Sequence, residues 1–175
     1  MTNTYSGIGS REINIMYATI CKQYAITLAS LDYTLQSGGA SGSDTAFEEG
    51  SDLVQGNKKI FLPWKDFNNN TSTLYGVCEK ALKIGEYFHP AWYKLSPKAK
   101  LLMARNSYQV LGENLDTPVD FIVCYTPNGE EKGGTAQSLR IARHFKIPVF
   151  NLGKLNSEGA LDNRIESVKL QKLLS

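Results

Sequence analysis

The sequence predicts an α/β protein built on one doubly wound parallel sheet with helices on both faces. Short apolar segments alternate along the chain with longer segments in which apolar residues recur at helical spacing. Residues 119–125 form a near-continuous apolar run, as central strands of parallel sheets do. Three apolar segments also run into glycine-rich turns. Because strands that alternate with helices favour a parallel sheet with right-handed crossovers, we expect a single Rossmann-like domain over residues 1–175.

Five strands are expected from the apolar segments. The first is short and polar and runs directly into Gly7. The third ends at Pro63, because proline cannot donate a hydrogen bond to a neighbouring strand. The polar residues after this proline form either a lid over a site or a long surface loop. The expected strands are residues 3–6, 33–37, 58–62, 119–125 and 148–152.

Six helices are expected between and after these strands. Helical spacing of apolar residues supports the first, and a glycine-rich turn precedes the second. Ser96 and Pro97 resemble the N-cap and the first residue of the fourth helix. The last helix is polar. The expected helices begin near residues 12, 43, 74, 97, 136 and 161.

The composition narrows the classes of partner. A chain of 175 residues fits one domain that buries a core without disulfides. The net charge is +2 and no basic run concentrates it, so nucleic acid is expected to be an unlikely partner. Three cysteines without Cys-x-x-Cys spacing, and no His/Asp/Glu cluster with ligand spacing, argue against disulfides and metal sites. Without a signal peptide or a membrane-spanning run, we expect a cytoplasmic protein with no membrane association.

Three glycine-rich loops follow predicted strands and should lie at one edge of the sheet, where ligands bind in such folds. Glycine lets a ligand approach the backbone, and the free N–H groups of a following helix bind anions. Each loop alone also fits a capped turn without a ligand. Together they predict a site for a phosphate-containing ligand. The expected binding residues are Gly7, Gly9, Ser10 and Arg11, then Gly38, Gly39, Ser41, Gly42 and Asp44, and finally Gly133, Gly134 and Thr135.

Charged residues on the predicted helices are candidates for binding or catalysis. Asp44 and Glu48 are four residues apart, so both are expected on one helix face, pointing toward the same mouth. Such a carboxylate pair either performs acid–base chemistry or forms a solvated face. Arg105, followed by Asn106, interrupts an apolar helical pattern, so it either faces the ligand or extends along the surface to solvent. The aromatic residues at 87–93 either pack a core or stack a base.

These motifs resemble those of the SLOG superfamily, which groups the Rossmann domain of DprA proteins with the lonely-guy phosphoribohydrolases. Residues 37–46 resemble its Gly-Gly-Ala-x-Gly-x-Asp-x-x-Ala signature. Residues 5–11 are similar to the opening of SLOG proteins that phages and bacteria encode. Arg105 and Asn106 resemble the family's arginine step, and residues 133–135 resemble its second phosphate-binding loop. The resemblance covers most of the chain.

The resemblance implies a nucleotide-type small-molecule ligand, bound without a cofactor. The glycine loops would hold phosphate, Asp44 would bind ribose hydroxyls, and Arg11 and Arg105 would neutralise charge. Lonely-guy enzymes carry a glutamate that cleaves an N-glycosidic bond, and Gln137 or Ser138 stands in its place here. The main expectation is therefore a stand-alone SLOG protein that sequesters a nucleotide immune signal, as a phage anti-defence protein in the host cytoplasm.

Two alternatives stay open. The chain would be a nucleotide N-glycosidase if Glu48 or Asp44 replaces the missing glutamate while Arg105 orients the phosphate, which makes these three the candidate catalytic residues. It would bind single-stranded DNA if it acts as DprA does, although its modest charge argues against a basic groove. Lonely-guy and DprA proteins self-associate, so the resemblance also implies a homo-oligomer.

Overall fold

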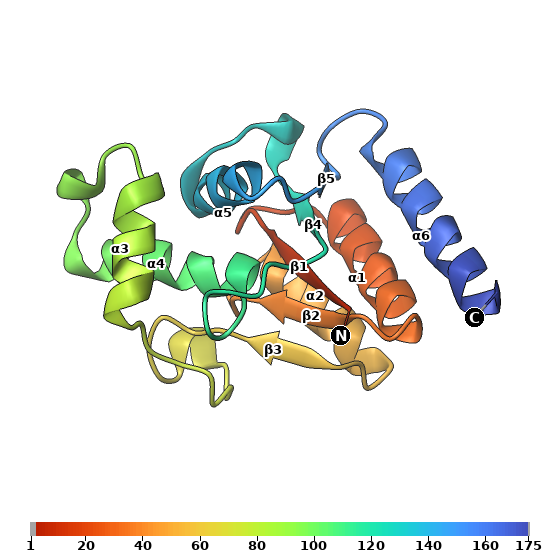
Figure 1. The fold of residues 1–175 in the computed structure, drawn as a ribbon, viewed down its shortest axis with the longest axis horizontal. Coiled ribbons are helices and arrows are strands. Elements are labelled where there is room, and N and C mark those ends of the chain that lie inside the picture. Colours follow the sequence, from red (N-terminus) through yellow and green to blue (C-terminus); the bar gives the residue numbers. More distant parts are fainter. Residues whose placement is uncertain (1–2, 175) are drawn as a thin grey trace.

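The computed structural model describes residues 3–174, which form a five-stranded parallel sheet between two layers of helices (Figure 1). The strand order is β3-β2-β1-β4-β5. This arrangement confirms the predicted α/β fold with a doubly wound sheet. The strands are β1 (Thr4–Gly9), β2 (Thr34–Ser37), β3 (Lys58–Ile60), β4 (Phe121–Tyr125) and β5 (Val149–Asn151).

Six α-helices connect and cover the strands. α1 begins at Ile15, and the Asn14 side chain caps it by accepting a hydrogen bond from the Tyr17 N–H at 3.0 Å. The predicted start at Glu12 is therefore wrong, and residues 10–14 form a loop ahead of the helix. The helices are α1 (Ile15–Ser30), α2 (Ser43–Leu53), α3 (Glu79–Phe88), α4 (Pro97–Leu111), α5 (Gly133–His144) and α6 (Ser157–Leu174).

Other helix starts show what local sequence predicts well. α2 begins at Ser43 and α4 at Pro97, as expected, and the Ser96 hydroxyl accepts a hydrogen bond from the Ala99 N–H at 3.2 Å. α5 begins at Gly133, three residues before its predicted start, because the glycines of the third loop themselves form the first turn. α6 also begins earlier than predicted, at residue 157.

The segment between β3 and α3 is irregular and longer than predicted. Its helix was expected from Leu74 but begins at Glu79, because Leu62 and Tyr75 pair in a β-bridge that keeps the chain extended. The Leu62 N–H donates to the Leu74 carbonyl at 2.8 Å. The 3₁₀ turn η1 (Phe67–Asn69) lies within this segment.

The two faces of the sheet bury separate hydrophobic cores, since side chains alternate along each strand. Phe121 and Val123 of β4 lie in the core that α1, α2 and α6 cover, whereas Ile122 and Cys124 lie in the core that α3, α4 and α5 cover. The near-continuous apolar run of β4 therefore reflects burial on both sides. All five of its residues are buried.

The chain changes direction at β1. After β1 it builds outward through β2 and β3, and it then crosses to the other side of β1 to form β4 and β5. Such a topological switch point leaves a crevice beyond the carboxyl ends of the two central strands. Gly9 of β1 and Tyr125 of β4 are partners in the sheet register at that edge. The predicted site should therefore lie directly beyond these two residues.

Two further properties concern the residues described by the structure. No helix within residues 3–174 is both long enough and apolar enough to cross a membrane. All three cysteines carry free thiols, with Cys21 and Cys124 buried and Cys78 exposed.

Candidate phosphate-binding site

A cavity of about 600 Å³ opens beyond the carboxyl ends of β1 and β4. Its walls are the loop after β1, the first turn of α2, the middle of α4, and the loop and first turn of α5. It therefore occupies the crevice that the strand order predicts. A ligand in this cavity contacts elements from both halves of the chain.

The first turn of α5 offers free hydrogen-bond donors to the cavity. The N–H groups of Gly133, Gly134 and Thr135 are at the helix start, where no intrahelical acceptor exists. Lys132 is the N-cap and provides no side-chain acceptor. One turn later the buried Ser138 hydroxyl has no hydrogen-bond partner among the described residues. Hydrogen-bond donors that lack acceptors at a helix N-terminus favour an anion as the ligand.

The glycine-rich loop before α2 binds a carboxylate of its own chain. Asp44 Oδ2 accepts hydrogen bonds from the Gly38 N–H at 3.1 Å and the Ala40 N–H at 3.5 Å. Gln109 Nε2 of α4 donates to the same oxygen at 3.4 Å. Asp44 thus takes the place that an external phosphate would take in an empty loop. The second predicted phosphate loop is filled from within the protein.

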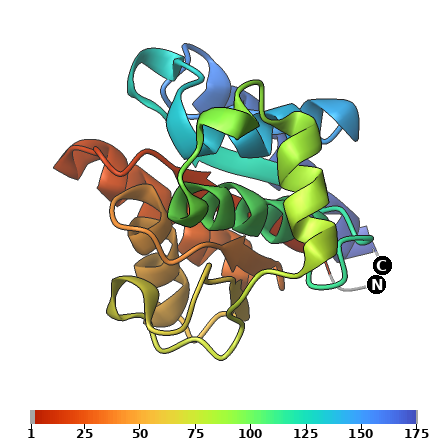
Figure 2. The same ribbon diagram turned by 90° about the vertical axis from the view of Figure 1, so that its left-hand side faces the viewer.

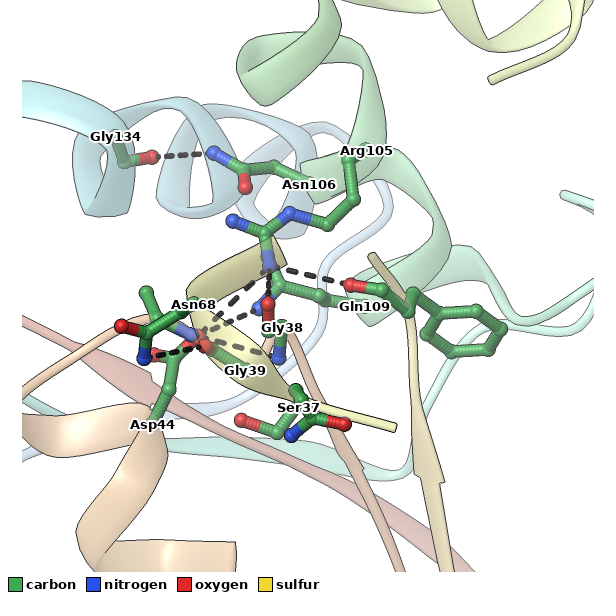
Figure 3. Close-up of polar contacts among 12 residues, drawn as sticks. Ser37, Gly38, Gly39, Asp44, Asn68, Arg105, Asn106, Gln109 and Gly134 are labelled. Atoms are coloured by element: carbon green, nitrogen blue, oxygen red, sulfur yellow. Dashed lines mark hydrogen bonds and ion pairs between the residues drawn. The ribbon is translucent and has the colours of Figure 1, made fainter. Parts of the chain in front are cut away.

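Arg105 links α4 to this loop (Figure 3). Its Nη1 donates to the carbonyl of Gly38 and, at 3.2 Å, to the carbonyl of Phe61, and it lies 3.9 Å from Asp44 Oδ2. The Phe67 ring lies 5.7 Å from the guanidinium carbon. Arg105 Nε is buried and makes no hydrogen bond within the described part of the chain. One end of the guanidinium therefore binds the scaffold, while Nε has no hydrogen-bond partner within residues 3–174.

Burial shifts both members of the Asp44–Arg105 pair toward their neutral forms. Loss of solvent raises the pKa of Asp44 to about 6, although Arg105 and the backbone N–H groups of Ala40, Gly9 and Gly38 oppose the shift. Loss of solvent likewise lowers the pKa of Arg105 to about 10, against the attraction of Asp44. Arg105 stays cationic at neutral pH, whereas Asp44 changes charge in a mildly acidic range.

Gly38 is required because Arg105 packs onto its backbone. A Cβ at this position would overlap Nη1 and Cζ of Arg105. Gly38→Ala is expected to lower the free energy of unfolding by about 2–3 kcal/mol, the cost of overpacking plus a displaced buried guanidinium. Urea denaturation of the two proteins measures the difference.

Gly159 of α6 provides the matched control for this prediction. A Cβ there would meet no atom within 4 Å. Gly159→Ala is expected to leave stability unchanged or to raise it by up to about 1 kcal/mol, because alanine is the better helix former. Equal losses in both variants would contradict the role given to the contact between Gly38 and Arg105.

The loop after β1 is fixed to both central elements. The Ser10 N–H donates to the Tyr125 carbonyl at 2.8 Å, and the Ser10 carbonyl accepts from the Ser43 N–H at 3.0 Å and the Ser43 hydroxyl at 2.9 Å. Gly42 is needed for this close approach, since its φ is +84° and a Cβ there would lie 2.5 Å from the Ser10 carbonyl oxygen. Arg11 follows at the cavity mouth, where it is exposed and forms no ion pair with any described residue.

Opposite charges balance at the mouth itself. Glu12 and Glu130 line it beside Arg11 and Lys132, and Lys132 forms an ion pair with Glu130. The rim is therefore not strongly basic. The groups suited to an anion lie inside the cavity, on the first turn of α5 and at Arg105.

Glu48 lies away from the cavity, so the prediction that it shares a mouth with Asp44 is wrong. Its carboxylate accepts hydrogen bonds from Lys58 Nζ and Asn70 Nδ2, both at 2.8 Å, and it is not among the lining residues. The first turn of α2 faces the cavity, but one turn later the same helix face meets Lys58, the first residue of β3, and Asn70 in the loop after β3. This placement gives no support to the catalytic role predicted for Glu48.

The structure separates the predicted binding residues into two groups. Those that line the cavity are Gly9, Ser10, Arg11, Asp44, Arg105, Asn106, Gly133, Gly134 and Thr135. Those outside it are Gly7, Gly38, Gly39, Ser41 and Gly42. Gly7 serves the core instead, because a Cβ there would lie 2.7 Å from both Leu35 and Phe47.

Gln109 and Ser138 are among the lining residues that the sequence analysis did not predict as binding residues. Gln109 lies one turn after Arg105 in a helix with apolar periodicity, and this spacing was the available signal. Ser138 was considered only as the replacement for a glutamate, although it is one turn from Thr135 on the same helix face. Asn106 holds the two helices together by donating from Nδ2 to the Gly134 carbonyl at 2.9 Å (Figure 3).

Metal ligands are not clustered in the described residues: no group of three or more His, Cys, Asp or Glu side chains within residues 3–174 could hold a metal ion. The chemistry of the cavity therefore has to be argued from its hydrogen-bond donors and its charges.

Comparison with known proteins adds a structural neighbour. No protein-family profile and no curated protein matches the sequence. A solved structure of DNA processing protein A from Helicobacter pylori, studied for its single-stranded DNA binding mode, is similar with a TM-score of 0.61. The two share 19% identity over 99% of this chain and 80% of the other.

This neighbour corrects one expectation. Nucleic acid was predicted to be an unlikely partner because the net charge is only +2. The solved protein of similar fold binds single-stranded DNA, and this finding contradicts the expectation that nucleic acid is an unlikely partner. At 19% identity the similarity shows the fold alone, and by fold this chain is DprA-like.

Proposed function

We propose that the cavity binds a nucleotide phosphate and that the nucleotide belongs to a single-stranded nucleic acid. The similarity in fold to a single-stranded DNA-binding protein supports the choice of partner. The first turn of α5, with Arg105 beside it, supports the choice of phosphate. The proposal replaces the small-molecule expectation as the leading function.

One observation carries this proposal: two residues that line the cavity each hold a buried donor atom that has no acceptor within residues 3–174. The two atoms are Ser138 Oγ and Arg105 Nε, and both residues are at least 95% buried, with relative exposures of 1% and 4%. A buried donor without a partner costs about 1–3 kcal/mol. A phosphate oxygen would recover that free energy, and its charge would strengthen both hydrogen bonds.

Ser138→Ala tests the proposal. The variant removes an unsatisfied hydroxyl, so the free protein is expected to be as stable as the wild type or more stable by up to about 1 kcal/mol. Its affinity for a fluorescent thymidine 20-mer is expected to fall about tenfold, the loss of one hydrogen bond to a charged group. Fluorescence anisotropy at fixed salt measures the affinity.

Ser107→Ala is the control, because the Ser107 hydroxyl is also buried on a helix without a partner but does not line the cavity. Its affinity for the 20-mer should equal that of the wild type. If Ser138→Ala binds the 20-mer as the wild type does, the cavity does not hold the phosphate, and the proposal fails.

A free nucleotide-derived small molecule is the second candidate. The cavity of about 600 Å³ is in the range of ligand pockets, which supports it. In this case the chain would sequester a nucleotide signal, as a stand-alone SLOG protein of phage origin would. Native mass spectrometry of protein purified from cells distinguishes the candidates, because a sequestered ligand stays bound at its full mass. The same spectrum gives the size of any homo-oligomer.

Cleavage of an N-glycosidic bond has weaker support. Glu48 is engaged by Lys58 outside the cavity, and Asp44 is engaged by the loop before α2. A pKa near 6 nevertheless suits Asp44 to proton transfer near neutral pH. Incubation with mononucleotides tests this activity directly: release of free base that Asp44→Asn abolishes would establish it.

A further inference from the structure

We propose that a strip of lysines and aromatic rings beside the cavity holds the neighbouring nucleotides of a bound single strand. This inference rests on the proposed function and extends it to a second contact surface. Figure 2 shows the backbone of α4 and of the segments around it, turned toward the viewer. The lysine–aromatic strip consists of Lys65, Lys94, Lys98 and Lys100 with Trp64, Trp92 and Tyr93. Lys98 and Trp64 lie on the cavity side of α4, whereas Lys100 and Trp92 lie on the other side, because Lys98 and Lys100 are two residues apart in the helix.

The charge of this strip is not neutralised. None of its four lysines lies within ion-pair distance of a carboxylate in residues 3–174. Elsewhere lysines such as Lys22, Lys58 and Lys59 are paired with glutamates. Residues 87–112, which contain most of the strip, include no Asp or Glu. The modest net charge of the chain therefore hides a local concentration of free positive charge, which is the electrostatic footprint of a polyanion site.

Each of three lysines lies over an aromatic ring. Lys98 Nζ is 5.9 Å from the ring centre of Trp64, Lys100 Nζ is 5.6 Å from that of Trp92, and Lys94 Nζ is 5.6 Å from that of Tyr93. Tyr93 is 79% exposed. Repeated pairs of a cation and a ring match a partner whose repeating unit is one phosphate and one flat base.

The strip continues into the cavity through contacts already described. The rings of Trp64 and Phe67 meet edge to face at 5.2 Å, and Phe67 lies against the Arg105 guanidinium. On α4, Lys98 precedes Arg105 by seven residues, which is about 10 Å along the helix axis. A strand with one phosphate in the cavity would therefore pass over the strip within a few nucleotides.

Single-stranded nucleic acid fits this strip better than other polyanions do. An acidic peptide would use the lysines and leave the rings without a role. A duplex presents phosphates but buries the base faces that would stack on Trp64 and Tyr93, the rings that do not pack into the core as Trp92 does. Exposed bases and a charged backbone together use both components of the strip.

Lys98→Glu tests the strip, with Lys146→Glu as a control of equal charge change. Lys146 is exposed, has no ion pair within the described chain and lies outside the strip, at the end of α5. The probes are a thymidine 20-mer and a 5′-phosphorylated thymidine dinucleotide. Lys98→Glu is expected to lower the affinity for the 20-mer about tenfold. It is also expected to make the plot of log affinity against log salt concentration shallower by about 1 or more. Its dinucleotide affinity should stay within about twofold of wild type, because a dinucleotide fills only the cavity.

The outcomes separate this inference from the proposed function. The proposed role of the strip is contradicted if Lys98→Glu binds the 20-mer as the wild type does, or if Lys146→Glu loses as much affinity as Lys98→Glu. Polyglutamate that competes as well as the 20-mer also overturns it, because the rings would then contribute nothing. If the dinucleotide fails to bind while the 20-mer binds in a Lys98-dependent way, the proposal that the cavity binds a nucleotide phosphate is contradicted. The proposal that the strip binds the strand is then supported. If neither probe binds the wild type, both proposals fall.

Discussion

Replacement of Arg105 by methionine is expected to lower the free energy of unfolding by about 3–5 kcal/mol, the cost of removing one partner from a buried ion pair. Arg105 is 4% exposed, and its Nη1 donates to the carbonyls of Gly38 and Phe61. Methionine keeps an apolar stem of similar length but leaves both carbonyls and the Asp44 carboxylate without this partner. Urea denaturation at pH 7.5 measures the loss.

Two further variants make this prediction specific. Asp44→Asn combined with Arg105→Met is expected to recover about 1–2 kcal/mol of the loss, because no buried charge then remains unpaired. Arg143→Met should cost less than about 1 kcal/mol, since Arg143 pairs with Glu131 at 2.8 Å on the surface with 64% of its side chain exposed. A loss at Arg105 no larger than that at Arg143 would refute the structural role assigned to the buried arginine.

Asp44→Asn is expected to raise the affinity for a single strand about tenfold at pH 7.5. The substitution removes a negative charge from the cavity wall, 3.9 Å from Nη1 of Arg105, which also lines the cavity. A unit charge at about 6 Å from the ligand and an effective dielectric near 20 contributes up to about 2–3 kcal/mol, and rearrangement of the loop reduces that figure. The asparagine oxygen still accepts a hydrogen bond from the Gly38 N–H, so the loop keeps its main contact.

The same substitution is expected to remove the pH dependence of the affinity for a single strand. Since the pKa of Asp44 is about 6 in the folded protein, wild-type affinity is expected to rise as pH falls from 7.5 to 5, while Asp44→Asn stays nearly constant. The phosphodiester probe keeps its charge over this range. Anisotropy titrations at constant ionic strength compare the two proteins. A pH dependence that persists in Asp44→Asn would assign it to another group and contradict this role of Asp44.

Protein stability gives an independent check on the direction of this shift. The folded-state pKa of Asp44, about 6, is above its ordinary value of 3.8. Because the pKa is raised, protonation of Asp44 stabilises the folded protein. This contribution to the free energy of unfolding is complete below pH 3.8 and is lost as pH rises through 6. The stability of wild type minus that of Asp44→Asn is therefore expected to fall by about 2–3 kcal/mol between pH 3.8 and pH 7.

Local signals in the sequence were sufficient to predict the strands, most of the helices and the parallel sheet. The buried run of β4 and the cap at Ser96 and Pro97 are properties of neighbouring residues, so they could be read without the fold. The alternation of strands and helices predicted the parallel sheet. The sheet in turn predicted the edge at which the glycine-rich loops lie. The third glycine loop lines the cavity for the same reason, since it follows a central strand.

Tertiary packing determined which of the predicted groups remain available to a ligand. The sequence alone identified the glycine loops before α2 and α5, Arg105 and a carboxylate on α2. Its first predicted glycine loop was wrong, because Gly7 and Gly9 belong to β1, and it did not show that Asp44 fills its own loop or that Glu48 faces Lys58. Nor did it show that the lysines beside the cavity lack acidic partners. Periodicity fixes which face of its own element a residue occupies, whereas the pairing of Asp44 with Arg105, 61 positions away, depends on how α4 is placed against the sheet. Neutralisation of a charge is a property of that long-range contact, so only the folded chain determines it.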